Sequence, residues 1–209
     1  MSITAKLINI DVDFHAAVNQ AAKLFHSGDV FIYPTDTVYG FGCNPFDRSA
    51  LNKINLIKAR REKKRYIILI DSVEALYKYV KPVSDRYANL LIKLWPNPVS
   101  VILNLNQKTG EKLNYKNAAF RIPANNFCIT LLNKLDMPLI STSVNLSNEK
   151  QLNDYLTIKS NFQDRVSAIF YTKSKSNTNP STIIDLTKSE PVVIREGKIN
   201  FMELYKKFT

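Results

Sequence analysis

The chain has 209 residues, 45% of them apolar, which is enough for one domain with a sizeable core. No apolar run approaches the ~20 residues that span a bilayer, the N-terminus does not resemble a signal peptide, and two cysteines are too few for a disulfide scaffold, so a cytoplasmic location without membrane contact is expected. The net charge of +11 favours polyanionic partners such as nucleotides, phosphates or RNA, although a lysine-rich composition by itself accounts for part of this excess.

Apolar spacing and turn residues predict alternating helices and strands along the first two-thirds of the chain, and mainly strands in the last third. Helices are expected over 13–26, 49–60 with Ser49 as the cap, 72–80, 84–95, 126–135 and 200–208. Strands are expected over 29–34, 66–70, 98–105, 118–123, 138–143, 166–171, 181–186 and 191–196. The remaining segments are expected to be loops or turns, namely 35–47, 106–117, 144–150 and 172–180. This order predicts an α/β fold, a mixed sheet flanked by helices, in a single domain over 1–209.

Several common catalytic motifs are absent from the sequence. There is no phosphate-binding P-loop, and Gly40 and Gly42 are not followed by the third glycine of a dinucleotide fingerprint. Both histidines, His15 and His26, fall on the first predicted helix. An enzyme with so few histidines and cysteines is expected to work by positioning its substrates and stabilising charge, as in phosphoryl and nucleotidyl transfer.

In four segments a predicted strand runs out into polar residues, and open α/β sheets bind ligands beyond the ends of their strands. They are 33–42, 121–123, 141–145 and 179–185. Each hydroxyl in them, taken alone, also fits a simple turn or cap, and so do Asp36 and Asp185. A further feature is the stretch from Lys58 to Arg65, which holds six cations and one acid next to an apolar strand.

The ordered combination of motifs is more specific than any one of them. The order is PTDT-x-YG-x-G, K-x-R with a cation four residues later, WPNPVSVIL, FRIP, STSVNLS, NPSTIID and REG. It resembles the YrdC family of threonylcarbamoyl-AMP synthases, in its short bacterial form (TsaC), over roughly residues 12–199. The resemblance implies a twisted α/β sheet with a concave, positively charged cavity.

The resemblance also implies a reaction. Members of the family combine L-threonine, bicarbonate and ATP into threonylcarbamoyl-adenylate and pyrophosphate, and the product is passed to the complex that makes the t6A modification at position 37 of tRNA. Mg²⁺ is expected with ATP and to be held mainly by phosphate oxygens, since the motifs contain no carboxylate cage and therefore no protein metal site.

On this resemblance, Lys58 and Arg60 match the K-x-R motif and are expected to assist the reaction at the phosphates. The residues expected to contact ATP are Lys58, Arg60, Lys64, Asn117, Ser143, Asn145 and Arg195. The remaining cations of the stretch, Arg61, Lys63 and Arg65, are not required by the motif and fit either a solvated loop or a weak contact with RNA. Arg61 and Arg65 stand where the family usually has proline, which puts the stiffness of the loop in doubt but not its charge.

The residues expected to bind L-threonine are Thr35, Arg121, Ser141 and Ser181. A guanidinium binds a carboxylate through two hydrogen bonds, so Arg121 is the expected partner of the threonine carboxylate, and a structural salt bridge is its alternative.

Two other functions stay open at this point. A non-enzymatic RNA-binding or ribosome-maturation protein would fit the positive charge, although no platform of aromatic residues among cations is evident. A carbamoyl-transferring domain of a hydrogenase-maturation protein would fit the motifs, although those proteins are much longer. The sequence does not determine the oligomeric state, the preferred metal, the kinetic constants or direct RNA contact.

Overall fold

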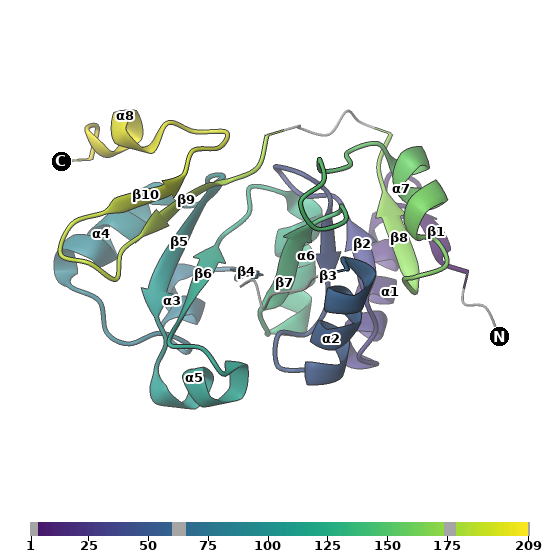
Figure 1. Ribbon diagram of the computed structural model, residues 1–209, viewed down its shortest axis with the longest axis horizontal. Helices are drawn as coiled ribbons and strands as arrows, with labels where there is room; N and C mark the ends of the chain where they lie inside the picture. Colours follow the sequence, from purple (N-terminus) through teal and green to yellow (C-terminus); the bar gives the residue numbers. More distant parts are fainter. Residues whose placement is uncertain (1–3, 60–65, 174–178, 209) are drawn as a thin grey trace.

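The structure is a computed structural model that describes residues 4–59, 66–173 and 179–208. Its strands form one mixed sheet in the order β1-β8-β2-β3-β7-β4-β6-β5-β9-β10, with β1 and β10 at the two edges (Figure 1). The strands are β1 (Lys6–Asn9), β2 (Phe31–Tyr33), β3 (Gly40–Gly42), β4 (Ile67–Leu69), β5 (Val99–Asn104), β6 (Asn117–Arg121), β7 (Leu139–Ser143), β8 (Ala168–Tyr171), β9 (Thr182–Asp185) and β10 (Val192–Arg195). The helices are α1 (Phe14–His26), α2 (Arg48–Ile57), α3 (Val73–Leu76), α4 (Asp85–Leu94), α5 (Gln107–Leu113), α6 (Asn126–Leu135), α7 (Tyr155–Phe162) and α8 (Phe201–Tyr205). The predicted α/β fold with a mixed sheet flanked by helices is confirmed.

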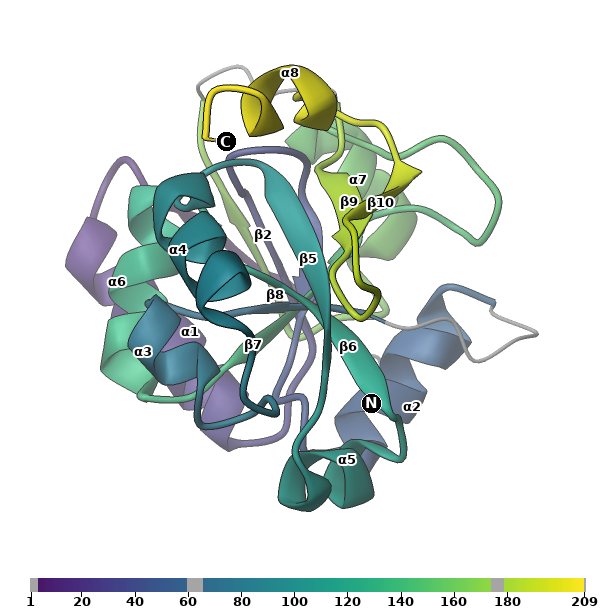
Figure 2. The same cartoon turned by 90° about the vertical axis from the view of Figure 1, so that its left-hand side faces the viewer.

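Helices cover both faces of the sheet. Figure 2 shows α1, α3, α4 and α6 on one side of the strands and α2 and α7 on the other. An aromatic core lies between α1, α6 and the sheet. In it, the ring of Phe170 packs against the rings of both Phe31 and Phe127. A larger cluster fills the opposite side and continues under α4. Burial of these two apolar clusters fixes the sheet as a rigid platform for the polar residues at its strand ends.

The long helices follow their sequence patterns closely. In α1 the buried residues recur on one stripe, from Ala17 to Phe25, and the side chain of Asp13 caps the helix by accepting from the backbone of Ala16 at 2.9 Å. The prediction over 126–135 agrees with α6 at both ends. Within the described ranges, no helix is both long enough and apolar enough to cross a bilayer.

Two segments that were predicted as loops contain regular structure. β3 forms at Gly40–Gly42 by pairing with β2 and β7, and its glycines are needed because a Cβ on Gly42 would lie 2.6 Å from the ring of Tyr33. α5 forms despite Gly110 in its interior, begins at the side-chain cap of Asn106 and ends with Asn114 in the left-handed conformation. Glycine has low propensity for both states, which is why the sequence pattern hid these elements.

Other predictions of local structure were wrong or incomplete. The cap of α2 is Asp47 rather than Ser49, since the Asp47 carboxylate accepts from the backbone of Ser49 and Ala50 at 2.9 and 3.1 Å. β1 and α7 were not predicted, and the helix predicted over 72–80 is regular only over Val73–Leu76. The predicted loop 172–180 lies partly outside the described residues.

Sheet pairing brings the polar segments together from distant parts of the sequence. β4 pairs with β6 on one side, which sets Leu69 beside Arg121, and with β7 on the other, which sets Ile67 beside Ser141. β3 pairs with β7, so that Gly40 lies opposite Ser143. The fourth segment is reached differently from the prediction, because residues 179–181 lead into β9 instead of leaving a strand.

Candidate active site

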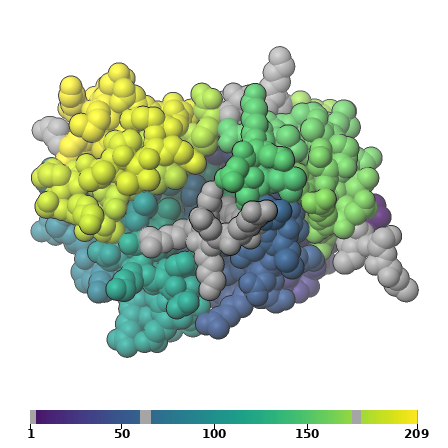
Figure 3. Space-filling model, viewed as in Figure 1, coloured from purple at the N-terminus to yellow at the C-terminus, as the bar shows by residue number. Residues whose placement is uncertain are grey.

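The polar segments surround a cavity of about 240 Å³. Its walls carry hydroxyl groups, two guanidinium groups and a few apolar side chains, and its lining residues are Thr37, Val38, Ile67, Arg121, Ser141, Thr142, Ser143, Gln151, Pro180, Ser181, Ile183 and Arg195. Figure 3 shows that the C-terminal segment (yellow), residues near 150 (green) and α2 (blue) come to one face of the molecule. The cavity therefore combines residues from both halves of the chain.

The loop after β2 is held by its own hydroxyl groups. Thr35 Oγ1 donates to the carbonyl oxygen of Val38 at 2.7 Å, accepts from the backbone nitrogen of Thr37 at 3.1 Å and lies 3.0 Å from Thr37 Oγ1. Thr35 is itself buried and is not among the described residues that line the cavity. It therefore shapes the loop, and the side chain that reaches the cavity is Thr37, two residues later.

Arg121 stands at the end of β6, 2% exposed, and forms an ion pair with Asp36 on the loop. Its Nη1 atom donates to Asp36 Oδ1 at 3.0 Å and to Thr37 Oγ1 at 3.2 Å. Its Nε atom is buried and has no hydrogen-bond partner among the described residues. Arg121 thus forms the structural salt bridge that was its alternative role and also lines the cavity, and its contact with the threonine carboxylate stays a prediction.

The two predicted serines come from separate parts of the sheet, because β4, β6 and β5 lie between β7 and β9. Ser141 on β7 has room for its hydroxyl because its neighbour is a glycine: a Cβ on Gly40 would lie 2.9 Å from Ser141 Oγ. Ser181 precedes β9, which runs parallel to β5, and its hydroxyl lies 2.9 Å from Ser100 Oγ. Both serines are almost fully buried and line the cavity, and their contact with L-threonine stays a prediction.

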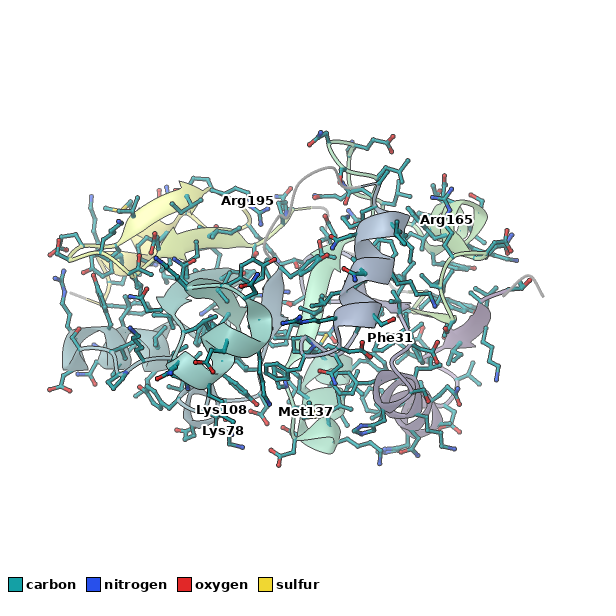
Figure 4. All side chains as sticks on the ribbon, turned by 60° about the horizontal axis from the view of Figure 1, so that its bottom comes forward. Phe31, Lys78, Lys108, Met137, Arg165 and Arg195 are labelled. Carbon is teal, nitrogen blue, oxygen red and sulfur yellow. The ribbon has the colours of Figure 1, made fainter. Side chains whose placement is uncertain are left out.

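Arg195 closes the same side of the cavity from the end of β10 (Figure 4). Its Nη2 and Nε atoms donate to the carbonyl oxygen of Ser181 at 2.7 and 3.2 Å. Burial, together with the positive charge of Arg121, lowers the pKa of Arg195 below its ordinary value. Gly197 allows the hairpin to approach so closely, since a Cβ there would lie 2.4 Å from the carbonyl oxygen of Pro180.

Lys58 is almost fully buried and forms a second polar cluster beside Ser143. Its Nζ atom donates to the carbonyl oxygen of Ser143, and to the carbonyl and side-chain oxygens of Asn145 at 2.9 and 2.8 Å. The Ser143 hydroxyl donates to the same Asn145 Oδ1 atom at 2.7 Å. The structure therefore unites the predicted K-x-R lysine with both residues of the predicted S-x-N pair.

The remaining predicted site residues are less well placed or are not described. Arg60 and Lys64 lie outside the described residues, as do Arg61, Lys63 and Arg65. Asn117 begins β6 beside Asn104 of β5 and is not among the described residues that line the cavity, so its contact with ATP stays a prediction.

The sequence analysis missed three polar residues of the cavity wall, Thr37, Thr142 and Gln151. The alternation of side chains along an extended loop would have found Thr37, because it stands two residues after Thr35. Gln151 lies in an irregular segment after β7, where no periodicity marks the direction of its side chain.

The chemistry of the cavity is that of an anion site. Arg121 and Arg195 present positive charge in a partly buried space, and charges interact more strongly there than in water. In the described part of the chain, no three histidine, cysteine, aspartate or glutamate residues gather to hold a metal ion. Both cysteine thiols are buried, which raises their pKa and disfavours the reactive thiolate. The arrangement suits two or more anionic groups that react with each other.

Comparison with known sequences identifies the family. The family profile Sua5_yciO_yrdC, described as "Telomere recombination", matches residues 23–197. A protein named threonylcarbamoyl-AMP synthase from Pseudoalteromonas translucida is 32% identical over 175 residues, which are 81% of this chain and 93% of that protein. A protein of Haemophilus influenzae that is named uncharacterized is 28% identical over 185 residues, which are 86% of this chain and 88% of that protein.

Solved structures have the same architecture. Sua5 of P. abyssi in complex with L-threonine matches with a TM-score of 0.86 and 25% identity, covering 97% of this chain and 60% of that one. YciO of E. coli matches with a TM-score of 0.83 and 29% identity, covering 96% of this chain and 98% of that one. This chain thus spans about three-fifths of the longer protein and nearly all of the shorter one. By profile, sequence identity and architecture, the chain belongs to the Sua5/YciO/YrdC family.

Proposed function

We propose that the protein is a threonylcarbamoyl-AMP synthase, which makes threonylcarbamoyl-adenylate and pyrophosphate from L-threonine, bicarbonate and ATP. The observation that carries this proposal is the cavity itself, where the buried guanidinium group of Arg121 and the more exposed one of Arg195 line the same space as several hydroxyl groups, in a chain of this family. Several relatives bear the name of this activity, and one related structure was solved with L-threonine.

The threonine end of the cavity is assigned to the side around Arg121. The guanidinium offers its unpaired Nε edge to the substrate carboxylate, which is the two-pronged geometry that arginine provides. The hydroxyls of Ser141 and Ser181 supply hydrogen bonds for the substrate's polar groups, and Val38 and Ile183 supply apolar contacts for its methyl group. A small, polar and chiral amino acid fits this combination better than a long or charged one.

The phosphate end is assigned to the wall that holds Ser143 and its hydrogen-bonded neighbour Asn145, and Arg195 is assigned to the phosphates from its place beside Ser181. Lys58 lies directly behind Ser143, and its ammonium group adds positive charge to this wall. We place Arg60 and Lys64 here on the motif alone. Mg²⁺ would enter as the ATP complex, held by phosphate oxygens, and would neutralise charge on the leaving pyrophosphate.

In the proposed reaction, the substrates supply the reacting groups. The neutral amine of threonine combines with bicarbonate, with loss of water, to give an N-carboxylate. An oxygen of this carbamate attacks the α-phosphorus of ATP, the bond to the β-phosphate bridging oxygen breaks, and pyrophosphate leaves with the electron pair. Both partners are anions, so their approach is opposed by Coulomb repulsion, and Lys58, Arg121 and Arg195 lower this cost.

The wider role follows from the product. Threonylcarbamoyl-adenylate is an activated acyl donor, and we propose that it passes to the tRNA t6A transferase complex in the cytoplasm. Direct contact of this chain with RNA stays a prediction, because the cations that suggested it lie outside the described residues.

The proposal is tested with the purified protein, ATP, Mg²⁺, bicarbonate and each amino acid in turn. Pyrophosphate should be released with L-threonine and bicarbonate together, and labelled bicarbonate should appear in an acid-labile adenylate. Release that is equal with and without threonine would contradict the proposal. Binding of RNA without any such release would favour the alternative of a non-enzymatic RNA-binding protein.

A further inference from the structure

Arg121 is hydrogen-bonded through one terminal nitrogen, whereas its Nε atom has no partner among the described residues. Its Nη1 atom is engaged by Asp36 Oδ1 at 3.0 Å and by Thr37 Oγ1 at 3.2 Å. The Nε atom is buried and has no hydrogen-bond partner in the described part of the chain, and Arg121 as a residue lines the cavity. A buried, unpaired donor of a charged group is unfavourable, so its persistence beside a cavity indicates that a ligand completes it.

The geometry of the guanidinium group determines which of its edges stays available to a ligand. The group is planar, and Nε shares one edge with Nη2, while Nη1 lies on the far side of that edge. Asp36 binds Nη1 and leaves the Nε–Nη2 edge available, which is one of the two edges that can bind a carboxylate through two parallel hydrogen bonds. The ion pair with Asp36 therefore selects which edge faces the ligand.

Asp36 is itself fixed within the loop. Its neighbour Thr37 contacts the same Nη1 atom, and the hydroxyl of Thr35 bonds across the loop to Val38. On the outer side, Lys198 Nζ donates to the carbonyl oxygen of Asp36 at 3.3 Å, which ties the loop to the segment after β10. The side chain of Asp36 is only 7% exposed, so the carboxylate has little freedom to release Arg121.

We propose that Asp36 is a positioning residue for substrate recognition: it locks the Arg121 guanidinium so that its Nε–Nη2 edge meets the carboxylate of the amino-acid substrate. Asp36 does not touch the substrate, and it acts through Arg121. This inference rests on the proposed function, because the ligand at that edge is taken to be L-threonine.

The direction in which KM for threonine changes distinguishes a positioning role of Asp36 from a purely electrostatic one. Removal of Asp36 takes a negative charge away from the site, and this change alone would strengthen the attraction of a carboxylate. If Asp36 acts by orientation, its removal weakens substrate binding in spite of the gain in positive charge. A higher KM for threonine is thus the opposite of what electrostatics alone would give.

The experiment measures KM for L-threonine and for ATP in Asp36→Asn and Asp36→Ala. The amide of Asp36→Asn still offers one oxygen to Nη1 but holds it less firmly, so we expect KM for threonine to rise about threefold to tenfold. In Asp36→Ala the hold is lost, and the rise should exceed about tenfold, while KM for ATP changes less than about twofold. Circular dichroism first checks that each variant is folded, and the ratio of its KM for threonine to its KM for ATP then tests the proposal. If Asp36→Ala does not fold, Asp36→Asn alone is sufficient, because asparagine is nearly equal in size to aspartate.

A second readout uses a substrate analogue without the charged group. Wild-type protein should bind L-threonine much more tightly than L-threoninamide in a calorimetric titration, and this preference should shrink in the Asp36 variants. A loss of general stability would weaken both ligands alike. Glu190→Ala is the matched control, since it removes the carboxylate of an exposed arginine pair at the edge of the molecule and should leave both KM values unchanged.

The outcomes separate the inference from the function on which it rests. If wild-type protein releases no threonine-dependent pyrophosphate, the proposed function fails, and the binding titration still reports on Asp36. If wild-type protein is active and the variants change both KM values by the same factor, or lower KM for threonine, then Asp36 does not position Arg121.

Discussion

Two arginine–carboxylate pairs in this molecule have opposite designs. Arg86 on α4 meets Glu190 with both terminal nitrogens, each at 2.7 Å, and both side chains are more than half exposed. Arg121 meets Asp36 through a single nitrogen at 3.0 Å, although both side chains are almost completely buried. The better-paired arginine lies on the surface, and the partly paired one lies inside.

This difference shows which arginine still has hydrogen-bond donors available for a ligand. In water the Arg86 pair contributes little, because solvent screens it and would satisfy both partners in any case. In the interior, an unused donor is costly unless a ligand engages it. Incomplete pairing at a buried position is therefore a better sign of a binding site than the number of ion pairs. Four predictions test this contrast between cavity and surface, and the largest effect comes first.

The largest effect is expected for Lys58→Met, which keeps the volume of the side chain and removes its charge. The Lys58 ammonium contacts Ser143 and Asn145 at the proposed phosphate wall, so its loss should lower kcat for threonine-dependent pyrophosphate release at least ~100-fold. Lys78→Met, which removes an exposed ion pair with Asp136, is the control and should be fully active. Wild-type turnover by the Lys58 variant would refute its placement in the site.

The next effect compares the two arginines directly. Arg121→Lys replaces a planar fork with an ammonium that cannot form the two-pronged contact, so KM for L-threonine should rise at least ~10-fold. The same change at Arg86 alters an exposed pair and should leave the kinetics as they are. Steady-state assays measure KM for L-threonine in both variants. An equal rise in KM would contradict the view that only the buried arginine serves the site.

A smaller effect is expected for Thr35→Val, which removes the hydroxyl that bonds to Val38 and Thr37. The loop would lose an internal hydrogen bond, a cost of about 1–3 kcal/mol where buried partners stay unsatisfied. Calorimetric titration should show weaker binding of threonine and nearly unchanged binding of ATP. Thr157→Val, at the exposed start of α7, is the control, and equal losses of both ligands for Thr35→Val would mean that the loop does not serve the threonine end.

The smallest effect concerns the surface pair and its dependence on pH. Hydrogen bonds from Arg86 lower the pKa of Glu190 below its ordinary value. A carboxyl whose pKa is depressed in the folded state stabilises the fold above its unfolded pKa of about 4.3, and this contribution is lost as the pH falls through the folded pKa. Urea unfolding of Glu190→Gln should therefore differ slightly from wild type at pH 7 and coincide with it at low pH. A large difference at pH 7 would contradict the view that the exposed pair is weak.

Sequence patterns were sufficient for the long amphipathic elements. α1, α4 and α6 follow the predicted ranges because their apolar stripes and their capping residues are local features of the chain. Elements that depend on neighbours were missed or misread. β3 consists of glycine, phenylalanine and glycine, and it is a strand because it pairs with β2 and β7, while the rings of Phe31 and Tyr33 fill the space beside Gly42.

For the site, the ordered motifs determined which residue types gather and, through the family, for what chemistry. Arg121, Ser141, Ser143, Ser181 and Arg195 all reach the cavity wall as the motifs indicated. Only the tertiary structure decided how they are used: Thr35 bonds within its loop, Thr37 lines the cavity, and Asp36 pairs with one terminal nitrogen of Arg121. Local sequence fixes the direction of a side chain relative to its own backbone, but the partner that satisfies a buried charge is set by strands paired across dozens of residues, and that pairing cannot be read from one segment.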